Sequence, residues 1–330
     1  MLPLMEEPAK VLEIATKPGE IVICSAVHTS GKWLAYCTTA RVRLLKVNDL
    51  DSERPSVTRL PLPDLDIVHH MSLYTIGAEA RLLVCPREGG AVVYSLEDDD
   101  PCRIFSASSS ELDLKEGIAR ISVGSGSCVM TDFSDQAICF DLRSNTLFSK
   151  LPHYSEAAIS AISTSSDGSV CILAYSNNRI MEVDLKKARY TQFSKDLNSR
   201  IPRGWLNRRT SILNVVHIAG NDDIVLLHDH SILATLDKEK EMPEPASKLM
   251  YTDPRSTPET DSASISSMGS LQGSRLEQTL STGLRMSRKY EHLLSLHHLG
   301  NDEIVAVEIK PGMIESQLPP SLKQKKFGGC

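Results

Sequence analysis

Short runs of alternating apolar and polar residues recur along this chain of 330 residues, with turn-forming residues between them. Alternation with a period of two is typical of a β-strand that buries one face. The runs fall into six groups that begin near Ile21, Ile67, Ile118, Ile159, Ile212 and Leu293. Each group predicts a small antiparallel sheet.

Turn residues divide each group into successive strands. Examples are the segments Thr29-Ser30-Gly31-Lys32, Ser166-Asp167-Gly168 and Gly220-Asn221-Asp222. Glycine and asparagine tolerate positive φ, and aspartate binds nearby backbone amides, so these residues end strands. A second turn, such as Glu88-Gly89-Gly90, follows in the same group. The repeating unit is therefore a meander of three or four strands.

The repeat length, roughly 40 to 50 residues, is typical of the blades of WD-repeat propellers. A β-sandwich also contains many short strands, but its unit is the single strand rather than a sheet. We therefore predict an all-β, WD-repeat-like β-propeller in one domain, 1–330. The Trp-Asp dipeptide is absent from its expected place, where Phe140-Asp141, Val183-Asp184 and Leu236-Asp237 end third strands instead.

Two segments depart from the repeat. Residues 240–288 are rich in Ser, Thr, Pro and Glu and have little apolar periodicity, so we expect a disordered insertion between the fifth and sixth groups. The C-terminal segment 319–330 begins with two prolines and is basic. Its residues Lys323, Lys325, Lys326 and Phe327 are candidate contacts to RNA phosphates or to an acidic protein face.

Composition limits the chemistry of the chain. Its net charge of −6 argues against nucleic-acid binding over the whole surface, so an RNA contact requires a local basic patch. The eight cysteines include no CxxC pair, and most lie inside predicted strands, which indicates buried, reduced thiols. No apolar run is long enough to span a membrane, and the short acidic N-terminal segment does not match a signal peptide.

No pattern for catalysis, a cofactor or a metal emerges. The pairs His69-His70 and His297-His298 each place at most one histidine on a given face of a strand. The segment His228-Asp229-His230 fits a loop that ends a strand. There is no GxSxG motif and no phosphate-binding loop. We expect no enzyme activity, no cofactor and no small-molecule substrate.

A basic segment around Trp205 has two interpretations. Trp205 could anchor a long loop between two sheets. Alternatively, Trp205 with Arg203, Arg208 and Arg209 could contact a partner, since Trp and Arg dominate the energetics of interfaces.

Four stretches of the chain carry a resemblance to known proteins: KPGEIVICSAVHTSGKWLAYCTTARVRLLKV, IPRGWLNRRTSILNVVHI, DDIVLLHDHSILATLDK and DEIVAVEIKPGMIESQLPPSLKQKKFGGC. In this order they resemble the cirhin family of WD-repeat subunits of the small-subunit processome. The family has two tandem propellers, and this chain is similar to the second. The sixth group lacks recognisable third and fourth strands, so we expect an incomplete propeller and a fragment or truncated gene product.

The resemblance implies a non-catalytic scaffold of the nucleus and nucleolus. Such a scaffold binds other propeller subunits of an early processome subcomplex and pre-rRNA, and it supports transcription and processing of the small-subunit rRNA precursor. A generic WD-repeat adaptor, such as a ubiquitin-ligase substrate receptor or a trafficking scaffold, requires only the repeat and stays as the alternative.

Overall fold

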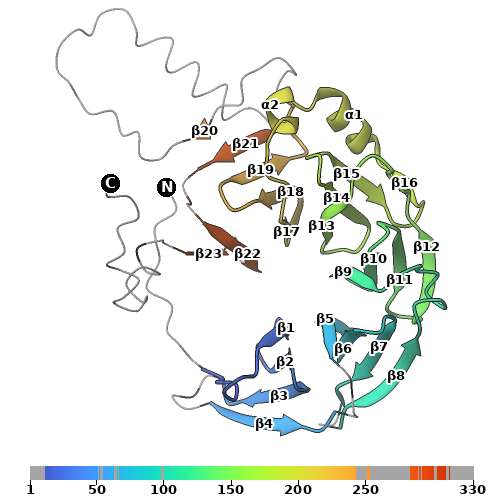
Figure 1. Cartoon of the computed structure of the whole chain (residues 1–330), viewed down its shortest axis with the longest axis vertical. Helices are drawn as coiled ribbons and strands as arrows, with labels where there is room; N and C mark the ends of the chain where they lie inside the picture. The colour runs from blue at the N-terminus through green and yellow to red at the C-terminus, as the bar shows by residue number, and fades with distance from the viewer. Residues whose placement is uncertain are drawn as a thin grey trace, which may run out of the picture. The chain divides into compact units, whose positions relative to one another are not determined.

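Nearly all of the regular structure is β-strand, which confirms the predicted fold class of a WD-repeat-like β-propeller. The computed structural model describes residues 12–50, 52, 55–62, 65, 67–97, 100–242, 251–252, 283–288, 290, 292–300, 303–309 and 312. The chain divides into two compact units, 1–150 and 151–330. Figure 1 labels the strands and helices of both units. The grouping of both units into one domain stays a prediction.

The first unit contains three four-stranded antiparallel sheets in which each strand pairs with the next along the chain. The first blade is β1 (Val22–Val27), β2 (Trp33–Thr38), β3 (Val42–Asn48) and β4 (Ser56–Leu60). The second is β5 (Val68–Ile76), β6 (Glu79–Pro86), β7 (Ala91–Ser95) and β8 (Cys102–Ala107). The third is β9 (Ile118–Val123), β10 (Ser127–Asp132), β11 (Ala137–Asp141) and β12 (Thr146–Lys150).

The second unit continues the pattern and adds two helices. The fourth blade is β13 (Ile159–Thr164), β14 (Val170–Tyr175), β15 (Ile180–Asp184) and β16 (Arg189–Tyr190). Helices α1 (Gln192–Arg200) and α2 (Arg203–Leu206) follow. The fifth blade contains β17 (Asn214–Ile218), β18 (Asn221–His228), β19 (Leu233–Asp237), β20 (Tyr251–Thr252) and β21 (Leu284–Ser287). The last sheet pairs β22 (Leu293–Gly300) with β23 (Glu303–Glu308).

One end of the predicted insertion, 240–288, contains a strand of the fifth blade. Strand β21 lies within 240–288, yet it pairs antiparallel with β19, and β20 pairs parallel with β21. Leu284 and Met286 alternate with polar neighbours and are buried in the core, which explains why this short run is ordered. The remainder of the predicted insertion, 243–250 and 253–282, lies outside the described residues.

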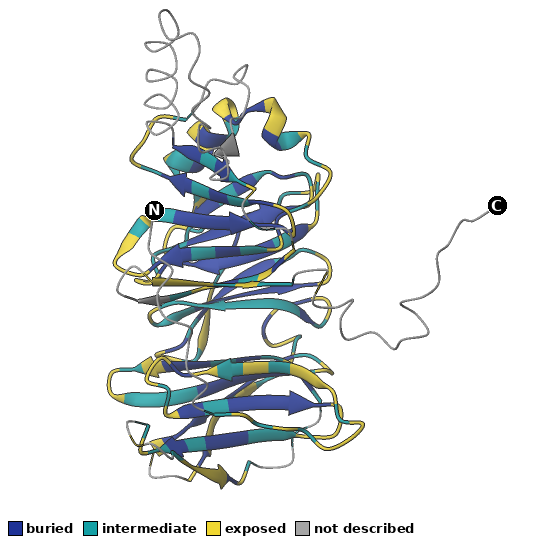
Figure 2. Cartoon of the chain, turned by 90° about the vertical axis from the view of Figure 1, so that its left-hand side faces the viewer, coloured by how far each residue is buried: buried dark blue, intermediate teal, exposed yellow. Residues whose placement is uncertain are grey.

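Burial follows the order of the strands within a blade. The middle strands β2, β7 and β14 are almost wholly buried, whereas the outer strands β4, β8 and β12 are mostly exposed. Figure 2 colours buried residues dark blue and exposed residues yellow. Apolar clusters fill the spaces between neighbouring blades: the first and second, the second and third, and the fourth and fifth. A single sheet cannot bury both faces, so these shared cores hold the blades together.

Histidines link the first strands of neighbouring blades in both units. In the first unit, His28 Nε2 lies 2.8 Å from Thr75 Oγ1, and in the second, His217 Nδ1 lies 2.9 Å from Ser163 Oγ. Both histidines are buried, and Ser163 is buried as well. A hydrogen bond to a buried ring nitrogen offsets its desolvation, so each pair stabilises the contact between two blades.

The cysteines fit the structural role expected from the sequence. Cys37, Cys85, Cys128, Cys139 and Cys171 are buried, and none of the cysteines in the described part of the chain forms a disulfide. Burial raises the pKa of the Cys24 thiol to about 12 and that of Cys139 to about 11. Both thiols therefore stay protonated at neutral pH and are poor nucleophiles.

Candidate functional site

A helical segment, 191–210, joins the fourth blade to the fifth. Thr191 caps α1, because its hydroxyl oxygen accepts a hydrogen bond from the amide of Ser194 at 3.1 Å. The helix ends at Arg200, and the next residue, Ile201, has an extended backbone because Pro202 follows it. Leu197 is buried on the face of α1 that packs against β15. The opposite face of α1 is exposed.

Trp205 anchors this segment. Its side chain is fully buried in the core that the fourth and fifth blades share, together with Leu197 and Ile212. The indole Nε1–H donates a hydrogen bond of 2.6 Å to the backbone carbonyl of Asn178, in the turn between β14 and β15. The Asn178 side chain in turn donates to the carbonyl of Arg208 at 3.0 Å. The segment is thereby fixed to the fourth blade at two points.

Arg208 ties the same segment to the fifth blade. Its guanidinium lies 4.5 Å from the centre of the Trp205 ring and forms an ion pair with Asp229, with side chains 8% and 1% exposed. The Thr210 hydroxyl donates to the same carboxylate at 2.5 Å. Burial acts to raise the pKa of Asp229, but hydrogen bonds from Thr210 and Ser231 and the charge of Arg208 outweigh it. The pKa of Asp229 is therefore lowered.

These positions divide the predicted contact residues. The side chains of Trp205 and Arg208 are buried, whereas the sequence offered both as candidate contacts to a partner. Arg203 and Arg209 are exposed, and their role as contacts stays a prediction. Lys323, Lys325, Lys326 and Phe327 lie outside the described residues.

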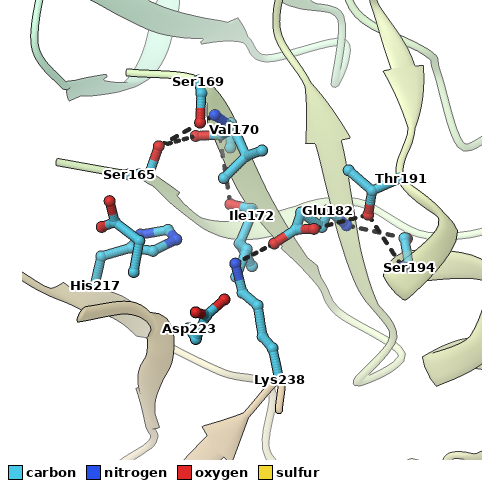
Figure 3. Close-up of polar contacts among 12 residues, drawn as sticks. Ser165, Ser169, Val170, Ile172, Glu182, Thr191, Ser194, His217, Asp223 and Lys238 are labelled. Atoms are coloured by element: carbon cyan, nitrogen blue, oxygen red, sulfur yellow. Dashed lines mark hydrogen bonds and ion pairs between the residues drawn. The ribbon is translucent and has the colours of Figure 1, made fainter. Parts of the chain in front are cut away.

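A buried ion pair holds α1 in place (Figure 3). Glu182 on β15 pairs with Lys238, which follows β19, and the two side chains are 6% and 11% exposed. The second carboxylate oxygen of Glu182 accepts a 2.7 Å hydrogen bond from Thr191, the capping residue of α1. The Glu182 amide also donates to the hydroxyl of Ser194 at 3.0 Å. The start of α1 is thus connected through Glu182 to the fifth blade.

Further polar contacts join the turns of the two blades. The Ser166 hydroxyl donates to the carboxylate of Asp222 at 2.8 Å. Gly168, in the same turn, has φ of 72°, a left-handed conformation that glycine adopts most readily. Burial, with the nearby charge of Lys238, lowers the pKa of His217 to about 4. His217 is therefore neutral at physiological pH and acts as a structural hydrogen-bonding group.

The helical segment and the turn that precedes it are rich in exposed basic residues. Residues 184–209 contain eight Lys and Arg residues and two Asp residues, a local charge of +6 in a chain whose net charge is −6. The exposed cations are Lys186, Lys187, Arg189, Lys195, Arg200, Arg203 and Arg209, which together we call the basic surface. Apart from Arg203 and Arg209, these residues did not enter the prediction from motifs. A count of charges along the sequence would have identified them.

The exposed side chains of this site are mostly cations. A positively charged surface attracts phosphates or carboxylates. In the part of the chain that the structure describes, no group of three or more His, Cys, Asp or Glu residues is placed to hold a metal ion. Asp229 fixes a turn, because its carboxylate accepts from the amides of Ser231 and Ile232 at 2.6 and 2.8 Å. No helix among the described residues is long and apolar enough to cross a membrane.

The antiparallel meanders define the chain as a WD-repeat-like β-propeller protein, and comparison with known proteins identifies its relatives. It is 26% identical over 332 residues to the mouse protein named U3 small nucleolar RNA-associated protein 4 homolog, and 22% identical over 330 residues to the human protein of that name. That protein is cirhin. Both alignments cover 99% of this chain and 46% of the relative, so the chain spans about half the length of these relatives.

No family model matches the chain. A chain in the crystal structure of a mitotic checkpoint complex is similar with a TM-score of 0.48 and 12% sequence identity, over 72% of this chain and 71% of that one.

Proposed function

We propose that the chain is a non-catalytic scaffold in ribosome biogenesis, similar to the U3 small nucleolar RNA-associated protein 4 homologs. The observation that carries the proposal is the similarity along almost the whole chain, 99%, to two such relatives. Blades that present many loops on a rigid frame suit a scaffold, since binding residues concentrate on loops held by regular structure.

On this proposal the chain works in the nucleolus, bound to other propeller subunits of the early processome and to pre-rRNA. Such binding supports transcription and processing of the small-subunit rRNA precursor. Arg203 and Arg209, together with the C-terminal Lys323, Lys325, Lys326 and Phe327, are the proposed contact residues. A generic adaptor for ubiquitin ligases or trafficking is less favoured, because both relatives carry a name tied to a small nucleolar RNA.

Sedimentation of nuclear extract tests this proposal. The tagged chain should sediment with particles far larger than its own 36.3 kDa, and treatment of the extract with RNase should shift it to lighter fractions. Co-sedimenting proteins identified by mass spectrometry should be other processome subunits. Sedimentation as a free chain, or with ubiquitin-ligase subunits and without sensitivity to RNase, would overturn the proposal.

A further inference from the structure

We propose that the basic surface, Lys186, Lys187, Arg189, Lys195, Arg200, Arg203 and Arg209, binds the phosphate backbone of single-stranded RNA without reading its bases. The inference deepens the proposed function, because it assigns RNA contact to a particular surface of this chain. It rests on the charge, the exposure and the rigid support of that surface.

The charge of this surface is available to a ligand. Lys187 is 77% exposed even though it pairs with Asp184. Among the described residues, no carboxylate forms an ion pair with Lys195, Arg200, Arg203 or Arg209. Unpaired, hydrated cations can exchange their counterions for RNA phosphates, and the release of those counterions drives binding.

The basic surface is also rigid. Trp205 and the Arg208–Asp229 ion pair fix the segment that contains Arg203 and Arg209. The Glu182–Lys238 ion pair, through Thr191, fixes the helix that contains Lys195 and Arg200. A surface that is already ordered loses little conformational entropy on binding, so more of the electrostatic attraction appears as affinity.

The composition of the surface favours RNA backbone over an acidic protein. Protein interfaces depend on aromatic or aliphatic anchors at their centre. No large apolar side chain between 184 and 210 is among the exposed ones: Trp205 is buried, and Phe193 packs against the core. The same fact argues against stacking of bases on aromatic rings. What remains is a set of cations, which suits contacts to phosphates that carry no sequence information.

Fluorescence anisotropy with labelled 20-nucleotide oligouridine and oligocytidine tests the inference on the full chain. The test variant combines K195Q, R200Q, R203Q and R209Q. The matched control replaces four exposed cations of the first unit, R41Q, R59Q, R87Q and K115Q, and changes the net charge equally. Polyglutamate of similar length serves as the acidic-protein probe.

Wild-type protein should bind both RNAs with similar affinity and bind polyglutamate more weakly at the same salt concentration. Each phosphate contact contributes about 0.7 to the slope of log affinity against log salt for single strands, so the test variant should lower the slope by about 3. Its affinity for RNA at about 100 mM salt should fall more than tenfold, whereas the control should change it less than about twofold.

An equal loss of RNA affinity in the test and control variants would overturn the inference. Tighter binding of the wild-type protein to polyglutamate than to RNA would also overturn it. A variant that keeps the charge, R200K with R203K and R209K, should retain most of the binding and the same circular dichroism spectrum. This retention separates lost contacts from lost fold. The outcome is independent of particle sedimentation, so the proposed function and this inference can fail separately.

Discussion

Truncation of Trp205 should destabilise the second unit more than any exposed substitution. Its side chain is fully buried and sits in the core shared by the fourth and fifth blades. Phe or Trp to Ala changes in such cores cost about 3–5 kcal/mol, which includes the cavity that remains. We therefore expect W205A to lower the free energy of unfolding by about 3–5 kcal/mol.

A second variant separates packing from hydrogen bonding at the same site. W205F retains most of the ring but loses the Nε1–H that donates to the Asn178 carbonyl at 2.6 Å. A buried carbonyl left without its donor costs about 1–3 kcal/mol, so W205F should be the milder variant. It should also weaken the contact of the Arg208 guanidinium with the ring, since Phe attracts cations less strongly than Trp does.

Urea unfolding followed by far-ultraviolet circular dichroism measures both effects. F148A is the matched control, because Phe148 is also aromatic but is 51% exposed. We expect F148A to change the free energy of unfolding by less than about 0.5 kcal/mol. A loss of less than about 1 kcal/mol in W205A would refute the idea that Trp205 anchors the segment. Equal losses in W205A and W205F would show that the hydrogen bond, not packing, dominates.

Three further predictions concern the same unit. A double-mutant cycle with R208M and D229N should give a coupling energy of about 1–3 kcal/mol in urea unfolding, and additive single effects would contradict a buried ion pair. The pKa of His217 is lowered to about 4 in the folded protein, so its imidazole binds a proton more tightly in the unfolded chain than in the folded one. The free energy of unfolding should therefore fall as the pH drops from about 6.5 towards 4, and H217N should reduce this dependence on pH. The same dependence on pH in H217N and in the wild type would refute this role of His217. L284A should lower the free energy of unfolding by about 2–5 kcal/mol because Leu284 is buried in the core. Deletion of 255–280 should leave the midpoint of the thermal transition within a few degrees of its original value. A larger effect of the deletion than of L284A would show that the boundary of the insertion is wrong.

The sequence predicts the blades because their middle strands are short, strongly apolar runs between turns. Strands such as β14 bury nearly every residue, and turns like the one at Gly168 mark their ends. The outer strands are harder to predict. Strand β4 is exposed at four of its five residues, so no apolar pattern reveals it.

The helical segment could be predicted only in part. Thr191 is a typical helix cap, and Phe193 and Leu197 are four residues apart, but two apolar residues give little periodicity. Whether Trp205 is buried or exposed depends on Asn178 and Asp229, which lie distant in the sequence. The ion pair between Glu182 and Lys238 likewise depends on tertiary packing, since neither residue has a sequence signature for pairing.

The central claim, that the chain is a scaffold on pre-ribosomal RNA, is tested most directly by sequencing the RNA that co-purifies with the tagged chain from nuclei. A tagged WD-repeat adaptor of a ubiquitin ligase, purified in parallel, is the control. We expect strong enrichment of U3 small nucleolar RNA and of the small-subunit rRNA precursor over this control. RNA recovered at the control level would contradict it.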